Sequence, residues 1–246
     1  MTQAKWNSLS YSHPVARRGV RSILVAIPAL VLSLSASAIC YWQTSVTLGL
    51  FLGPLVLTTL FTPAMILSHD EWRGRLSVLT ALIIGPGIVW LSVANNITFH
   101  QVFLCELVLA GWVTLVSGGT LLLRESRIVP ILAGTVTLFI ACLWLTWPIW
   151  LSPALPAHQR AVGWLCWAHP VMALNSVVRQ LGVWGSPMGG SDLAYRFLTI
   201  LNQDVAYPHS QSIWPCVLLH GLIGLPLLSV SFLLGNLRTG RKTVSG

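Results

Sequence analysis

The fold class is decided by one apolar stretch, residues 101–123, which reads QVFLCELVLAGWVTLVSGGTLLL. A hydrocarbon layer about 30 Å thick needs roughly 20 apolar residues in helical form, because a backbone polar group left unpaired in lipid costs several kcal/mol. This stretch supplies that length. Its apolar residues are continuous and do not alternate with a period of two, so a β-barrel strand fits poorly. We therefore expect a transmembrane α-helix.

The composition of the whole chain points to the same class of protein. Of its 246 residues 54% are hydrophobic and 8% are charged, whereas a soluble domain carries about 25% charged residues. Similar apolar stretches recur, and they predict an all-α integral membrane protein with about six transmembrane helices. The expected spans are residues 23–42, 46–67, 76–94, 101–123, 128–149 and 213–234. Five of them therefore fall within residues 23–149, before a long connection, and the sixth follows it.

The placement of positive charge predicts the side of the membrane on which each loop lies. Eleven of the 14 Lys and Arg residues fall in segments 1–22 and 235–246 or in the loops after the second and fourth spans. By the positive-inside rule these segments are cytoplasmic, so both termini are expected inside the cell. The protein is expected in a cell membrane of the bacterial inner-membrane type, in contact with the lipid bilayer. No basic segment is interleaved with aromatic residues, so no nucleic-acid partner is expected.

The first apolar stretch has a competing interpretation. Arg17 and Arg18 precede a run that ends in the small residues 35–38, as in a cleavable signal peptide. The run continues, however, through Tyr41 and Trp42, where an interfacial aromatic belt would lie. We favour an uncleaved signal anchor.

The connection over residues 150–212 is far longer than the other loops and is expected on the outer side. Its first part, residues 161–184, contains His169, Pro170 and Arg179, so crossing the membrane would bury several unpaired polar groups. A re-entrant or interfacial helix pair interrupted at Pro170 fits better. Residues 192–204 have the spacing of a short amphipathic helix.

Two Cys–His pairs fall on the outer side of this topology. Cys166 and His169 are three residues apart, and Cys216 and His220 are four apart on the opening turns of the last span. Such helical spacing can direct both side chains at one Zn(II) or Cu(I) ion. The same residues are also common in helix packing, and Cys166 and Cys216 could form a disulfide on an oxidising side. We favour packing over a metal site.

One carboxylate and the Trp residues complete the candidate positions. Glu106 is the one carboxylate inside an expected span, about a turn from its outer end, where an ionisable residue suggests a functional role or snorkels to the interface. The 12 Trp residues suit interfacial anchoring. No cofactor is expected.

The loop after the second span is the most informative cytoplasmic segment. It is charged and helix-compatible, and it is followed by Leu76, Leu79 and Pro86. The predicted functional residues of this loop are His69, Asp70, Glu71, Trp72, Arg73, Gly74 and Arg75.

This layout resembles the permease subunits of ABC-2-type ATP-binding-cassette transporters. These have six spans, a short cytoplasmic coupling helix after the second span and re-entrant helices before the sixth. The family's acidic residue, glycine, leucines and proline would be Glu71, Gly74, Leu76, Leu79 and Pro86. Its outer Pro-x-x-Ala-Leu pattern is similar to residues 170–174. The family's usual threonine after the glycine is replaced by arginine here.

The resemblance implies which partners this chain would have and which subunit would hydrolyse ATP. The chain would be the permease subunit of an exporter, and ATP hydrolysis would occur on a separate ATPase subunit, so this chain would not be an enzyme. A charged loop docked on that ATPase would act as a lever on the adjoining spans. A second permease copy, or a related permease, would complete the path.

Two other functions stay open from the sequence. A multi-span scaffold or assembly protein would use the outer connection as a binding surface. A metal- or redox-handling membrane protein would use Cys166, His169, Cys216 and His220 at the outer face.

Overall fold

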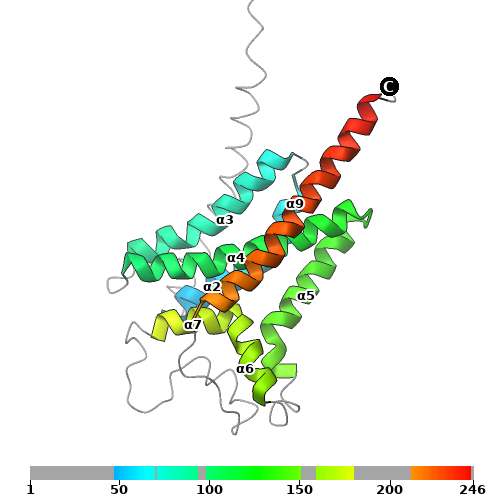
Figure 1. Cartoon of the computed structure of the whole chain (residues 1–246). Coiled ribbons are helices and arrows are strands. Elements are labelled where there is room, and N and C mark those ends of the chain that lie inside the picture. Colours follow the sequence, from blue (N-terminus) through cyan, green and yellow to red (C-terminus); the bar gives the residue numbers. More distant parts are fainter. Residues whose placement is uncertain (1–46, 70, 94–97, 151–158, 180–211, 245–246) are drawn as a thin grey trace, which may run out of the picture.

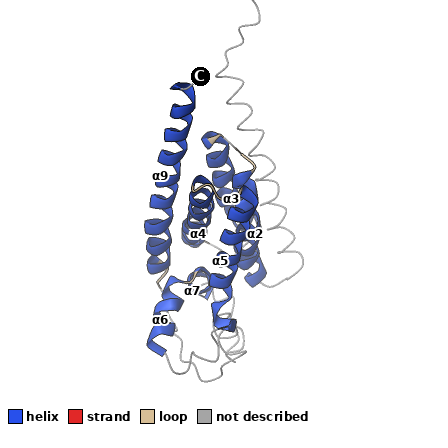
Figure 2. Cartoon of the chain, turned by 90° about the vertical axis from the view of Figure 1, so that its right-hand side faces the viewer, coloured by secondary structure: helices blue, strands red, loops and turns tan. Residues whose placement is uncertain are grey.

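The computed structural model describes residues 47–69, 71–93, 98–150, 159–179 and 212–244 (Figure 1). Within these residues the regular elements are all helices, and none is a strand (Figure 2). The all-α prediction is confirmed for this part of the chain. The seven helices described are α2 (Thr47–Leu67), α3 (Trp72–Val93), α4 (Phe99–Glu125), α5 (Pro130–Trp150), α6 (Gln159–Ala168), α7 (Pro170–Arg179) and α9 (Trp214–Val244).

Several of these helices have the length and composition of membrane spans. The apolar part of α2 with this character, Gly53–Leu67, is shorter than a full span. The expected first span, residues 23–42, and the expected amphipathic helix, residues 192–204, lie outside the described residues. The four long apolar segments are Trp72–Leu91, Phe99–Glu125, Pro130–Trp147 and Trp214–Leu237. The length and composition of these helices are those of a multi-pass membrane protein.

Helices extend beyond the apolar stretches that predict them. The prediction placed the start of the third span at residue 76, whereas α3 begins at Trp72. The last span was expected to end at residue 234, whereas α9 continues to Val244 through most of the expected tail. The length of an apolar stretch reflects the thickness of the hydrocarbon layer. The helix itself can continue into the polar flanks, because water and side chains satisfy the backbone groups at its ends.

Local sequence fixes several helix ends. The side chain of Thr98 accepts a hydrogen bond from the backbone N–H of Gln101, whose side chain accepts one from the backbone N–H of Thr98. This capping box starts α4. Between α6 and α7 the helix breaks at His169, and Pro170 is the first residue of α7, where its missing N–H costs nothing. The predicted helix pair interrupted at Pro170 is thus confirmed.

Helix α4 lies at the centre of the described fold. It contacts α2, α3, α5, α7 and α9, and its Trp112 is almost fully buried. The indole N–H of Trp112 donates to Thr59 Oγ1 of α2 at 2.7 Å. At one end of the long helices, α6 and α7 gather near the start of α9 (Figures 1 and 2).

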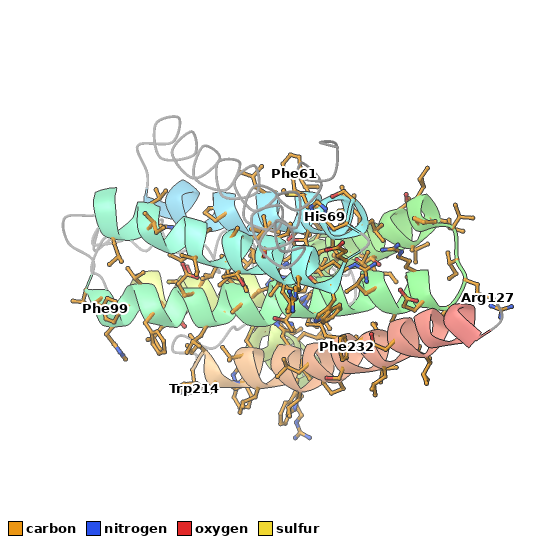
Figure 3. All side chains as sticks on the ribbon, turned by 90° about the horizontal axis from the view of Figure 1, so that it is seen from above. Phe61, His69, Phe99, Arg127, Trp214 and Phe232 are labelled. Atoms are coloured by element: carbon orange, nitrogen blue, oxygen red, sulfur yellow. The ribbon has the colours of Figure 1, made fainter. Side chains whose placement is uncertain are left out.

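The α4–α9 contact is the most extensive of the described helix pairs. The two helices run in the same direction, with Phe99 and Trp214 towards one end and Arg127 at the other (Figure 3). Glycines bring their backbones together. A Cβ added at Gly118 would lie 2.9 Å from the carbonyl oxygen of Gly224, and one added at Gly224 would lie 2.7 Å from the backbone nitrogen of Leu115. Small residues play this role in membrane helix pairs, where close backbone approach replaces the hydrophobic driving force.

Candidate functional site

The predicted coupling loop forms the junction between α2 and α3. Ser68 and His69 follow α2, and Glu71 immediately precedes α3. Asp70 lies outside the described residues. Residues 72–75 form the first turn of α3, so the charged segment continues directly into the membrane helix. A displacement of this turn would therefore act on α3 without an intervening flexible joint.

The junction is fixed to α3 and α4 through one backbone carbonyl. The carbonyl oxygen of His69 accepts a hydrogen bond from Arg75 Nε at 2.8 Å and a longer one from Arg124 Nη1 at 3.3 Å. Hydrogen bonds from a guanidinium are about twice as strong as neutral ones. Arg75 is buried, and its guanidinium holds the loop against the first turn of α3.

A second contact joins the same turn to α9. The rings of Trp72 and Phe232 lie with centroids 5.1 Å apart and planes tilted by 50°, within the range of favourable aromatic pairs. The junction is thus attached to both α4 and α9, the two helices that pack most extensively on each other. In Figure 3, His69 and Phe232 lie at a similar position along α4.

The remaining residues of the loop divide into exposed charges and a packed glycine. Glu71 and Arg73 are exposed. Gly74 is buried, and a Cβ there would meet His69 at 3.5 Å, an ordinary contact. An alanine at this position would therefore also fit against His69.

Glu106 occupies a close contact between α3 and α4. Its Oε1 and Oε2 are both buried and make no hydrogen bond to the described residues. The carboxyl group fills the space that a side chain at Gly87 would take: an added Cβ would overlap Oε1. The expectation that this carboxylate snorkels to the interface does not fit this position, because the side chain ends against the backbone of α3.

The two Cys–His pairs differ in the contacts of their histidines. Cys216 Sγ lies 3.4 Å from His220 Nδ1, as their helical spacing predicts. His169 instead directs Nε2 at the carbonyl oxygens of Trp144 and Leu145, at 3.1 and 3.2 Å. Cys166 and Cys216 are both buried.

These contacts bear on the disulfide and metal interpretations. Cys166 and Cys216 are not joined by a disulfide in the structure. Within the described residues no three His, Cys, Asp or Glu side chains converge as a metal site would require. The pairs contribute to helix packing: His169 contacts the rings of Trp144 and Trp147.

An apolar cavity of about 450 Å³ lies between α4, α5 and α9. Its volume is in the range of small-molecule sites. Two polar groups at its wall are engaged elsewhere: Thr137 donates to the carbonyl of Ala133, and His220 contacts Cys216. The indole N–H of Trp144, which also lines the cavity, makes no hydrogen bond to the described residues. The lining includes Trp112, Leu115, Gly119, Ile140, Leu219 and Ile223. Sequence reasoning missed this cavity, because it depends on how far α5 and α9 diverge.

Comparison with known proteins gives no family assignment. No protein-family model, no curated protein and no solved structure matches this chain.

Proposed function

We propose that this chain is the membrane permease subunit of an ABC-2-like exporter, energised by a separate ATP-binding-cassette ATPase. The observation that carries the proposal is the attachment of the α2–α3 junction to both α4 and α9, through His69 and through Trp72. This attachment would let a force applied to the loop reach α4 and α9.

The geometry supplies each part that such a coupling needs. Glu71 and Arg73 are exposed for contact with the ATPase. The first turn of α3 leads directly into the membrane. Helices α4 and α9, to which the junction is attached, border the apolar cavity. Movement of the loop relative to the membrane would therefore change the walls of a cavity suited to apolar parts of a substrate.

The proposal includes the arrangement of the subunits. Two copies of this chain, or this chain with a related permease, enclose the path, each bound to one ATPase. Both termini and the α2–α3 junction lie in the cytoplasm of a bacterial cell, and the outer connection faces away from it. ATP hydrolysis takes place on the partner.

The test is recovery of the ATPase with the tagged full chain in a gentle detergent. Wild type should retain a partner with ATPase activity, and Glu71→Arg should lose most of it, because reversing an exposed interface charge weakens association by roughly ten-fold or more. The matched control is Arg160→Glu, another reversal of an exposed charge, on α6 at the far end.

The outcomes separate the proposed functions. An ATPase that is retained by Arg160→Glu and lost by Glu71→Arg supports the permease and the coupling junction together. Absence of any ATPase from wild type contradicts the permease and favours a scaffold that uses the outer connection. Metal bound in stoichiometric amount and lost in Cys216→Ala would favour the metal-handling function.

A further inference from the structure

Glu106 is the feature of the molecule that the proposed function leaves unused. It lies in α4, which crosses the membrane, and both of its carboxyl oxygens are buried. An isolated ionised carboxylate in such surroundings is very costly, whereas a neutral carboxylic acid is far cheaper to bury. Either a nearby cation or hydrogen-bond donor compensates the charge of this carboxylate, or the carboxyl group is protonated and neutral.

No compensating cation is found among the described residues. Glu106 takes part in no ion pair or hydrogen bond there, and α3 carries its two arginines, Arg73 and Arg75, in its first turn at the cytoplasmic end. The neighbouring ionisable groups are thiols and one imidazole. Cys105 precedes Glu106 in α4, and His220 of α9, which contacts Cys216, packs against α4 at Gly111. Helices α2 and α5 add only Cys142, and the described side chains of α7 add none.

The backbone against which Glu106 rests offers little compensation for a negative charge. The N–H of Gly87 lies close to the carboxyl group, but its geometry falls short of a hydrogen bond. A buried carboxylate needs hydrogen bonds or a cation to offset its lost hydration, whereas a neutral carboxylic acid is buried at far lower cost.

We propose that Glu106 holds a proton as a neutral carboxylic acid, forming a membrane-embedded proton-binding site between α3 and α4 that hydrophobic carbodiimides modify. Gly87 makes the site, because any side chain at that position would overlap the carboxyl group. The site does not depend on transport or on a partner ATPase, so its test is independent of the proposed function.

The chemistry of the modification reports the protonation state directly. The carboxyl oxygen adds to the central carbon of dicyclohexylcarbodiimide while the acid proton passes to a carbodiimide nitrogen. The acyl group then migrates to nitrogen and leaves a stable N-acylurea, with no leaving group. An ordinary glutamate near pH 7 is protonated in roughly one molecule in five hundred, so a neutral buried acid reacts far more readily.

The experiment uses the full chain in lipid nanodiscs near pH 7. Dicyclohexylcarbodiimide should add one adduct at Glu106, located by peptide mass spectrometry, and the adduct should be absent from Glu106→Gln. A water-soluble carbodiimide should modify Glu71 in preference to Glu106, because Glu71 is exposed and both carboxyl oxygens of Glu106 are buried. Gly87→Ala should lower labelling of Glu106 several-fold, because the added methyl group displaces the carboxyl.

Infrared spectroscopy provides a readout that does not depend on reagent access. Wild type should show the carbonyl stretch of a protonated carboxyl, and Glu106→Gln should lack it while unfolding at the same temperature, since a neutral acid and an amide have nearly the same shape. The proposal is overturned if the two spectra agree in that band, if Glu106 stays unlabelled by the hydrophobic reagent, or if the water-soluble reagent modifies Glu106 as fast as Glu71.

Discussion

Replacing Gly224 by alanine tests the close packing of α4 and α9. The added Cβ would lie 2.7 Å from the backbone nitrogen of Leu115 and 2.9 Å from its Cα. Both are backbone atoms, so no side-chain rotation relieves the overlap. Restoring ordinary contact requires the helices to part locally by roughly 0.7 Å, and a gap of that size forfeits about a quarter to a half of the dispersion energy of the facing atoms.

The expected loss of stability follows from these terms. Overpacking of this kind costs about 1–3 kcal/mol. The better helix propensity of alanine returns up to about 1 kcal/mol. We therefore expect Gly224→Ala to lower the free energy of unfolding by about 1–2 kcal/mol.

The control is Gly221→Ala in the same helix. An added Cβ at Gly221 meets no atom within 4 Å, so only the propensity term applies, and this variant should be as stable as wild type or slightly more stable. Unfolding in mixed micelles with rising detergent fraction, followed by tryptophan fluorescence, measures both variants. Equal unfolding midpoints for Gly224→Ala and Gly221→Ala would refute the glycine-mediated contact.

Three further substitutions test single contacts. Thr59→Val should cost about 1–3 kcal/mol in the same unfolding assay, because the indole N–H of Trp112 then stays buried without its acceptor; a cost no greater than that of an exposed Thr→Val change would contradict this. Trp72→Ala should leave the fold intact but uncouple partner ATPase activity from binding of the ATPase, since it removes the ring contact with Phe232; unchanged ATPase stimulation would argue against this contact in coupling. Thr98→Ala should remove the cap of α4 at a cost of about 1 kcal/mol, seen as faster hydrogen exchange in the first turn of α4; unaltered exchange there would show that the cap contributes nothing.

The sequence predicted the helices better than their ends. Continuous apolar stretches near residues 76–94, 101–123, 128–149 and 213–234 each correspond to a long apolar helix, because the cost of unpaired backbone in lipid leaves few other conformations. The break before Pro170 was also predictable, since proline constrains its own helix and the residue before it. The extension of α9 beyond residue 234 was not predictable, because the end of an apolar stretch does not determine where helical hydrogen bonding stops in the polar residues that follow.

Contacts between segments that are distant in the sequence could not be predicted. The spacing of Cys216 and His220 predicts that they touch, and they do, because both belong to one helix. The contact of Glu106 with Gly87 and the pairing of Gly118 with Gly224 join different helices. Their residue types carry no sign of the partner until the relative placement of the helices is known.

The distribution of contacts suggests where the membrane domain can change shape. The backbones of α4 and α9 lie in close contact at Gly118 and Gly224, so a movement of one helix would displace the other. Helix α5, by contrast, packs on α2 and α4 but has little contact with α9 among the described residues, and the apolar cavity lies at that gap. If the junction held by His69 transmits force to α4 and α9, we expect α9 to move relative to α5, because these two helices have little contact with each other. In the proposed permease, the cavity wall would then be the first structure to respond to a movement of the junction.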